Sequence, residues 1–247
     1  PKIQTINTRK AKLKQQMTYN FSNEMIAAIK KALVTSMQVI LFQNRRGYSP
    51  VLSCDTCSYI PNCKHCDVSL TYHKWNSQLQ CHYCSYTENI PKVCPSCSNK
   101  HFSDKGFGTE QIEENLNKLF PDNIIKRMDY DTTRGKYAYQ KIINDFEKGR
   151  IDILVGTQMI TKGLDFDNVA LVGILDADSM LYFPDFRSYE RAFQLMVQVS
   201  GRAGRKQKRG KVLIQTYDDQ HEIFEMIKKN DYISFIKKQS NERRLFN

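Results

Sequence analysis

Cysteine is absent from most of this chain, because all eight cysteines of its 247 residues lie between residues 54 and 97. Acidic residues are scarce at the beginning, where residues 1–53 hold nine lysines and arginines but only Glu24 as an acid. No apolar run approaches the roughly 20 residues that a membrane-spanning helix needs, so we expect no membrane partner. The pattern G-x-x-x-x-G-K-[ST] is also missing, which excludes a phosphate-binding loop of that type within these residues.

The cysteines form four C-x-x-C pairs, so each pair can occupy one tight turn. Such a turn directs two thiolates at one tetrahedral ion, and two turns complete the closed four-sulfur shell of a structural zinc site. Four turns therefore predict two Zn²⁺ ions. A disulfide framework is the alternative, but paired C-x-x-C turns are typical of metal sites and imply reduced thiols in the cytoplasm.

The residues between the second and third pairs indicate which thiols share an ion. Apolar residues alternate at Val68, Leu70 and Tyr72, and a turn at Asn76-Ser77 follows, which predicts a β-hairpin. A hairpin brings the two inner pairs together and leaves the two outer pairs for the other site. We favour this nested arrangement, although a pairing of neighbours stays open. It assigns Cys54, Cys57, Cys94 and Cys97 to the first zinc and Cys63, Cys66, Cys81 and Cys84 to the second.

The aromatic residues of this stretch allow two interpretations. They can stack on nucleic-acid bases, or they can close a small core around the metal ions. We expect Tyr72 and Tyr83 to belong to such a core, while Trp75 fits either role. Whether the module contacts DNA or protein is left open by its sequence.

Positive charge predominates in the chain as a whole. The formal net charge is +11 and the pI is about 9.2, which favours nucleic acid as a polyanionic partner. A zinc ion with four thiolates carries a charge of −2, so two loaded sites lower the formal charge to about +7. The chain therefore stays basic when both sites are filled.

Short apolar runs and amphipathic segments alternate outside the cysteine stretch. Ser22 is expected to cap one helix, Thr109 a second, and Gly149 to end a third. This alternation predicts an α/β fold, with a mostly parallel, doubly wound sheet and helices on both faces. We expect helices near residues 22–33, 109–119, 136–148, 189–198 and 221–229, and strands at 39–42, 124–128, 151–155, 169–175 and 211–216.

The domain organisation follows from these assignments. Residues 1–20 are polar and basic and lack a periodic apolar face, so we expect them to be a linker. Residues 21–53 and 98–247 form one discontinuous α/β domain. Residues 54–97 form the zinc module inserted into it.

Several polar residues follow a strand or open a helix. They are Arg45 and Arg46 after the first strand, then Thr109, Asp129 and Thr157. Because ligands bind at the carboxyl edge of open parallel sheets, we expect these residues to share one edge. For the two adjacent arginines, a solvated surface pair is the alternative.

Residues 155–165, Val-Gly-Thr-Gln-Met-Ile-Thr-Lys-Gly-Leu-Asp, join a strand end to a loop rich in small hydroxyls and backbone donors. Such a loop suits phosphate groups. Lys162 adds positive charge, Gly163 permits close approach, and Asp165 can accept a hydrogen bond from a hydroxyl or a water. The loop is therefore a candidate phosphate site, although phosphate loops are numerous.

Residues 198–205, Gln-Val-Ser-Gly-Arg-Ala-Gly-Arg, carry two guanidinium groups three residues apart. The small residues Ala203 and Gly204 between Arg202 and Arg205 allow both groups to project together. Paired guanidinium groups stabilise the charge of a transferring γ-phosphoryl group. These residues are candidates for phosphoryl-transfer chemistry.

The two stretches resemble motifs V and VI of the second motor lobe of superfamily 2 helicases. Before them come Asn44-Arg-Arg-Gly-Tyr48, the four C-x-x-C pairs, Gly106-Phe-Gly-Thr-Glu110 and Asp129-x-Asp-Thr-Thr133, in that order. This ordered set resembles the PriA family of primosomal replication-restart helicases from about residue 20 to the end. The resemblance implies a RecA-like lobe, ATP with Mg²⁺ shared with an upstream lobe, and the nested zinc assignment.

The resemblance also implies a function for the whole protein. It would be a 3′→5′ DNA helicase that recognises stalled replication forks and initiates primosome assembly. Its partners would be forked or single-stranded DNA, other primosome proteins and single-stranded-DNA-binding protein. Its location would be the bacterial cytoplasm, in association with the nucleoid.

Roles for individual residues follow from the motif match. Arg205 would be the arginine finger and Arg202 its partner at the phosphates. The remaining candidates are Lys162, Gly163, Asp165 and Gln198 for the nucleotide, and Arg45, Arg46, Thr109 and Thr157 for DNA.

The missing phosphate loop limits what these residues can do alone. We expect the chain to be a fragment, with the phosphate loop and the magnesium-binding acid upstream, and to be inactive as an ATPase by itself. Asp176 and Asp178 follow a strand but are better explained as a polar sheet end than as a magnesium site. The alternative function is a zinc-ribbon module that binds nucleic acid or docks proteins without motor activity.

Overall fold

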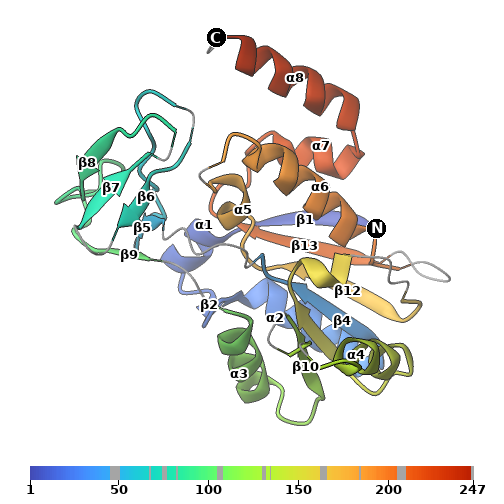
Figure 1. Ribbon diagram of the computed structural model, residues 1–247. Coiled ribbons are helices and arrows are strands. Elements are labelled where there is room, and N and C mark those ends of the chain that lie inside the picture. Colours follow the sequence, from blue (N-terminus) through green and yellow to red (C-terminus); the bar gives the residue numbers. More distant parts are fainter. Residues whose placement is uncertain are drawn as a thin grey trace.

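The computed structural model describes residues 1–44, 51–66, 68–73, 77–81, 83–104, 108–129, 132–133, 135–161, 166–183, 185–204 and 210–245. Its main element is a six-stranded sheet in the order β1-β13-β12-β4-β11-β10, in which every pair of neighbours is parallel (Figure 1). The strands are β1 (Lys2–Asn7), β4 (Gln38–Phe42), β10 (Ile125–Met128), β11 (Ile153–Gly156), β12 (Val169–Ile174) and β13 (Lys211–Thr216). The predicted α/β class with a parallel sheet is confirmed.

Helices cover both faces of this sheet, as the sequence predicts. The helices of the described chain are α1 (Thr8–Leu13), α2 (Asn23–Val34), α3 (Thr109–Leu119), α4 (Ala138–Glu147), α5 (Asp178–Leu181), α6 (Ser188–Ser200), α7 (Ile223–Lys229) and α8 (Tyr232–Leu245). A short 3₁₀ turn, η1 (Gln158–Thr161), follows β11. The short helices α1 and α5 and the C-terminal helix α8 were not predicted.

Strand β4 shows how the two faces are buried. Successive side chains of a strand point to opposite faces, so Val39 and Leu41 join the core under α2 and α3. Ile40 and Phe42 join the core under α4, α6 and α7. A strand that is buried on both faces has a continuous run of apolar residues in its sequence. This run is why β4 could be predicted from the sequence.

The ends of two helices agree with the predicted capping. The Ser22 hydroxyl accepts a hydrogen bond from the Met25 amide at 3.2 Å, at the start of α2. Gly149 follows α4 with a φ of +68°, a left-handed conformation that glycine adopts without strain. The cap at Ser22 and the conformation of Gly149 each depend on neighbouring residues, so the sequence alone was enough to predict them.

The prediction of a linker over residues 1–20 is wrong. Residues Lys2–Asn7 form β1, which pairs with β13 over six residue positions, and Ile6 is buried against the α2 side of the sheet. The Asn7 side chain then caps α1 by accepting from the Lys10 amide at 2.8 Å. β1 has few apolar residues, so its own sequence does not predict a strand. It is ordered because it pairs with β13, and that pairing cannot be seen in the local sequence.

The cysteine stretch forms a small body beside the sheet, drawn in teal and green in Figure 1. At its base β5 (Leu52–Cys54) pairs antiparallel with β9 (Phe102–Asp104). Beyond it β6 (Thr71–His73), β7 (Gln78–Gln80) and β8 (Thr87–Asn89) form an antiparallel sheet. The predicted hairpin is the β6–β7 pair.

A small core lies under this antiparallel sheet. Leu70 and Leu79 are fully buried there, and Tyr72 packs against them. Tyr83 does not, because 47% of its surface is exposed, so its expected place in the core is a correction. The stretch has too few residues to bury every aromatic side chain behind the metal-binding turns.

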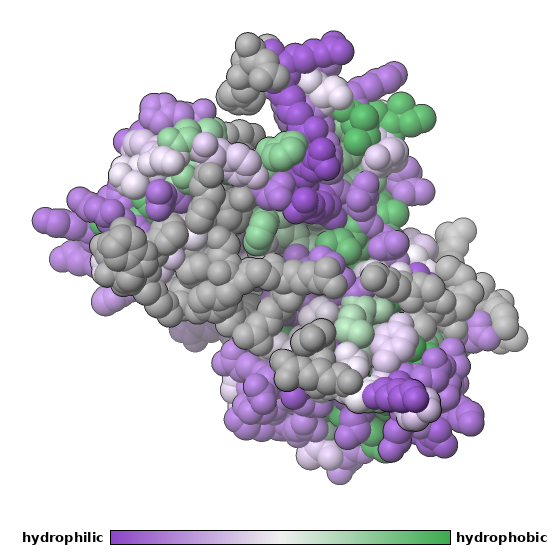
Figure 2. Space-filling view, in the orientation of Figure 1, coloured by the Kyte–Doolittle hydropathy of each residue, from purple (hydrophilic) through white to green (hydrophobic). Residues whose placement is uncertain are grey.

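On the face shown in Figure 2, hydrophilic residues cover most of the described surface and hydrophobic residues form small separate groups. In the described part of the chain, no helix has both the length and the apolar character needed to cross a bilayer.

Candidate functional site

Backbone hydrogen bonds join the carboxyl ends of three neighbouring strands. The Thr157 amide, after β11, donates to the Met128 carbonyl of β10 at 3.4 Å. The Gln43 amide, after β4, donates to the Gly156 carbonyl of β11 at 3.0 Å. Ligands bind at this edge in open parallel sheets, so this edge is the candidate site.

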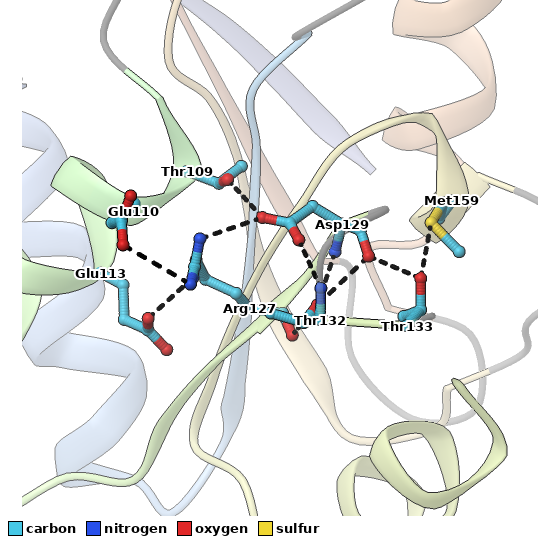
Figure 3. Close-up of polar contacts among 8 residues, drawn as sticks. All are labelled: Thr109, Glu110, Glu113, Arg127, Asp129, Thr132, Thr133 and Met159. Atoms are coloured by element: carbon cyan, nitrogen blue, oxygen red, sulfur yellow. Dashed lines mark hydrogen bonds and ion pairs between the residues drawn. The ribbon is translucent and has the colours of Figure 1, made fainter. Parts of the chain in front are cut away.

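Asp129, which follows β10, is the centre of the polar network in Figure 3. Its carboxylate accepts the Thr109 hydroxyl at 2.6 Å and the Thr132 amide at 3.0 Å, and Arg127 Nη1 lies 3.3 Å away. The Thr133 hydroxyl donates to the Asp129 carbonyl at 2.6 Å. One residue therefore fastens the start of α3 to the end of β10 and to the turn that follows. This places Thr109 and Asp129 together, as expected.

Arg127 completes the network from strand β10. Its Nε donates to Glu113 at 2.9 Å, and its Nη2 lies 4.0 Å from Glu110. Sequence reasoning missed this residue, although Glu110 and Glu113 stand one helical turn apart and so present two carboxylates on one face of α3. The positive charge of Arg127 therefore lies beside three carboxylates, those of Glu110, Glu113 and Asp129.

The charge state of Asp129 follows from these contacts. Partial burial opposes its ionisation, but the hydrogen bonds from Thr109 and Thr132 and the charge of Arg127 outweigh that effect. The pKa of Asp129 therefore lies below its ordinary value. At neutral pH it is a fixed anion that holds three donors in place.

Both threonines proposed as DNA contacts are buried. Thr109 is 2% exposed and Thr157 is 9% exposed. Thr109 is also not the helix cap, which corrects the sequence prediction: the extended Gly108 holds the N-cap position, and the Thr109 hydroxyl is directed at Asp129. Backbone amides at the start of α3 lack acceptors within the helix, so they are the donors that this end can offer to a ligand.

Arg202 lies where helix α6 meets the turn after β11. Its Nη2 donates to the carbonyl oxygen of Thr161 at 2.6 Å. Thr161 is the last residue of η1, and Arg202 follows α6 by two residues. The segments that resemble motifs V and VI are therefore in direct contact. Gln198 is exposed in the last turn of α6.

Six of the proposed site residues lie outside the described part of the chain. They are Arg45, Arg46, Lys162, Gly163, Asp165 and Arg205.

The acidic residues after β12 form hydrogen bonds at the carboxyl ends of β12 and β13. Asp178 accepts the Thr216 hydroxyl at 2.7 Å and the Tyr217 amide at 2.9 Å, at the end of β13. Burial raises the pKa of Asp178 to about 8, and the carboxylate of Asp176 adds to the shift. Asp176 itself accepts from the Ser179 amide at 3.1 Å. These bonds agree with the predicted polar sheet end.

The cysteine thiols gather in two groups of four, as the nested arrangement predicts: Cys54, Cys57, Cys94 and Cys97, and Cys63, Cys66, Cys81 and Cys84. In each group all sulfur atoms lie within 4.8 Å of one another, and the closest pairs are 3.5 Å apart. Four sulfurs bound to a zinc ion at about 2.3 Å lie about 3.8 Å apart. Both groups therefore fit zinc in donor type, number and spacing.

The thiols within a group differ in how readily they ionise. Burial opposes ionisation of Cys54, but the backbone amides of Cys57 and Thr56 outweigh it and lower the pKa of Cys54 to about 6. In the same group, the backbone amide of Asn99 opposes the shift, but burial and the neighbouring thiols outweigh it and raise the pKa of Cys97 to about 12. Four thiolates in one group repel one another at these distances, so a group without a cation does not hold four negative charges. A divalent ion removes that restriction.

Two family models match this chain. "Helicase conserved C-terminal domain" matches residues 88–207, and "PriA DNA helicase Cys-rich region (CRR) domain" matches residues 63–88. Among solved structures, Mycobacterium smegmatis helicase Lhr bound to ssDNA and AMP-PNP is 13% identical with a TM-score of 0.44, covering 85% of this chain and 19% of that one.

Curated relatives match far more closely. The replication restart protein PriA of Bacillus subtilis (strain 168) is 45% identical over 244 residues, which covers 99% of this chain and 30% of the relative. Replication restart protein PriA of Synechocystis sp. is 45% identical over 251 residues, covering 100% and 30%, and that of Haemophilus influenzae is 42% identical over 226 residues, covering 91% and 31%. The chain spans about 30% of the length of these relatives. Over that span, the chain belongs to the family of PriA replication restart proteins.

Proposed function

We propose that the sheet and its helices are the second motor lobe of an ATP-dependent 3′→5′ DNA helicase that restarts replication. Residues 21–53 and 98–247 make up this lobe, β1 adds an edge strand to it, and residues 54–97 are an inserted zinc module. The observation that carries the proposal is the 2.6 Å contact between Arg202 and Thr161, because it joins the two segments that resemble helicase motifs V and VI. The match to PriA proteins along the whole chain supports it.

ATP with Mg²⁺ is proposed to bind between this lobe and a segment that supplies the phosphate loop. Arg205 acts as the arginine finger and Arg202 supports it, because a guanidinium group stabilises the charge that develops on a transferring phosphoryl group. Four residues of the two motif segments complete this side of the site: Lys162, Gly163, Asp165 and Gln198.

DNA is proposed to run along the same edge of the sheet. The first amides of α3 suit phosphate oxygens, since a helix start combines free N–H donors with a positive dipole end, and the backbone amides of the η1 turn are further donors. Thr109 and Thr157 hold these two backbone segments, and Arg45 and Arg46 add charge. The buried threonine side chains therefore position the donors rather than forming the surface themselves.

The two cysteine groups are proposed to hold one structural Zn²⁺ each. Zinc supplies the cross-link that holds the C-x-x-C turns together, which a module with so small a core needs. The loaded module is then available to contact DNA at a stalled fork, other primosome proteins or single-stranded-DNA-binding protein. We place the whole protein in the bacterial cytoplasm, associated with the nucleoid.

DNA-stimulated ATP hydrolysis by the longer protein tests this proposal. We expect Arg205→Ala to reduce turnover by about 10³-fold or more while DNA binding is retained. Arg150→Ala is the matched control, because Arg150 is exposed on the turn after α4 and pairs there with Asp145. Equal turnover in both variants would refute the motor function and favour a zinc-ribbon module that binds nucleic acid or docks proteins.

The chain by itself provides a second test. Without a phosphate loop it is expected to hydrolyse no ATP above background, with or without DNA. Joining it to the upstream part of the longer protein should restore turnover. Clear DNA-stimulated hydrolysis by the chain alone would contradict a site shared between two lobes.

A further inference from the structure

One contact joins the cysteine module to helix α6. The Phe186 amide, just before α6, donates to the Tyr83 hydroxyl at 2.9 Å. The two rings also meet edge to face, with centroids 6.2 Å apart and an interplanar angle of 85°. Tyr83 lies between Cys81 and Cys84, so the module side of the contact belongs to the turn of the second cysteine group.

The lobe holds Phe186 from its other sides. The guanidinium groups of Arg187 and Arg243 lie 5.1 Å and 5.4 Å from the centre of its ring. Arg243, from α8, also donates to the Phe186 carbonyl at 3.4 Å and pairs with Glu190 of α6 at 2.5 Å. Although Phe186 is 53% exposed, its ring and backbone are therefore held by side chains of three separate segments. The two guanidinium contacts and the edge-to-face contact with Tyr83 favour a fastening role for this ring.

Helix α6 connects this contact with the candidate site. Phe186 immediately precedes the N-cap residue Arg187, so its amide has no acceptor within the helix. The 13 residues of α6 span roughly 20 Å, and the chain then reaches Arg202 and its contact with Thr161. α6 is therefore the element that connects the Tyr83 contact with the candidate site.

The position of Tyr83 depends on the second cysteine group. Tyr83 is outside the small apolar core of the module, and its backbone is held by the C-x-x-C turn at Cys81 and Cys84. A turn of this kind is ordered by the ion that its thiolates bind. Loss of the ion frees the turn, and the Phe186 amide then loses its acceptor.

We propose that Tyr83 is a positioning residue that links occupancy of the second cysteine group to the ordering of the start of α6. This rests on the proposed function in one respect, namely that the far end of α6 belongs to a nucleotide site. The link itself needs neither ATP nor DNA. It gives the zinc module a mechanical connection to the motor lobe.

Amide hydrogen exchange of Phe186 in the zinc-loaded chain tests the link. Tyr83→Phe keeps the ring and removes the acceptor, so we expect exchange of the Phe186 amide to become roughly fivefold faster at unchanged zinc content. Removing zinc from the unmodified chain with a chelator should accelerate the same amide at least as much. Exchange of the first turn of α6 should rise with it, while the core strand β4 keeps its protection.

Tyr86→Phe is the matched control. Tyr86 lies in the same module and its hydroxyl donates to Glu88 at 2.9 Å, within the module. Its loss should leave the Phe186 amide unchanged. Equal exchange in Tyr83→Phe and Tyr86→Phe, or full protection of Phe186 after zinc removal, would overturn the proposal. Because no catalytic activity is read, neither result depends on whether the chain belongs to a motor.

Discussion

The Thr109 hydroxyl donates to Asp129 Oδ2 at 2.6 Å and thereby fastens the first residue of α3 to the end of β10. The two residues are twenty positions apart in sequence, and both belong to segments that resemble helicase motifs. Asp129 also holds the Thr132 amide and faces Arg127. The edge that we assign to DNA is therefore shaped by one buried anion.

Asp129→Asn is expected to destabilise the chain by about 1–3 kcal/mol. The neutral amide keeps the size of the side chain but loses the charge that faces Arg127, and one of its acceptors becomes a donor. Urea unfolding measures the change. Asp122→Asn, at an exposed position after α3, is the control and should shift the free energy of unfolding by less than about 0.5 kcal/mol. Equal shifts in both variants would contradict a structural role for Asp129.

Asp178 should make stability depend on pH in the neutral range. Its folded-state pKa is raised to about 8, whereas an unfolded aspartate has a pKa of about 3.9. The folded chain thus binds the proton more tightly, and this contribution to stability is complete below the unfolded value and lost as pH rises through about 8. The free energy of unfolding should therefore fall between about pH 4 and about pH 8 more steeply in the unmodified chain than in Asp178→Asn. Parallel pH profiles would exclude this role, and Asp122→Asn should keep the steeper profile.

Metal analysis should find two zinc ions per chain, one for each cysteine group. Cys57→Ser removes a buried thiolate from the first group, so we expect one ion to be lost and the second to remain. Ser96→Ala, in the exposed turn between Cys94 and Cys97, should keep both ions. Acid should release zinc, because protons compete for the thiolates. Loss of both ions from Cys57→Ser would show that the two groups do not bind independently.

Gly156→Ala tests the close packing under the candidate edge. A Cβ at Gly156 would lie 2.7 Å from Ile160 Cγ1 and 2.9 Å from the Met128 carbonyl oxygen. Since the carbonyl belongs to the adjacent strand, it cannot move freely, and we expect a loss of about 1–3 kcal/mol in urea unfolding. At Gly135 a Cβ would meet only Ala138 Cβ, at 3.4 Å, among the described neighbours, so Gly135→Ala should cost much less. Similar costs at both glycines would argue against the close approach.

Local signals explain why so much of the fold was predictable. The cap at Ser22, the left-handed Gly149 and the apolar run of β4 each depend on residues next to one another, and each appears in the structure as predicted. The edge strand β1 was missed because its order comes from β13, which lies two hundred residues away. Thr109 was assigned the wrong position for a related reason: its hydroxyl is taken by Asp129 across the fold.

In the candidate site, too, some residues could be predicted from the sequence and others could not. Sequence motifs singled out Thr109, Thr157 and Arg202, but not Arg127, whose importance depends on Asp129 and two glutamates of α3. Tyr83 was expected in the core of the zinc module and instead contacts Phe186 of the α/β domain. A side chain's partner on another element is set by packing, and no pattern within either segment encodes it.

The sequence by itself determined the parallel α/β class, the two sets of four thiols and the family resemblance, because these depend on spacing and on periodic patterns along the chain. Only the tertiary structure decided that the start of the chain completes the sheet, that Asp129 organises the candidate edge, and that the zinc module touches α6 through Tyr83. Those features arise from contacts between residues far apart in sequence, whose energies depend on distance and burial once the chain has folded.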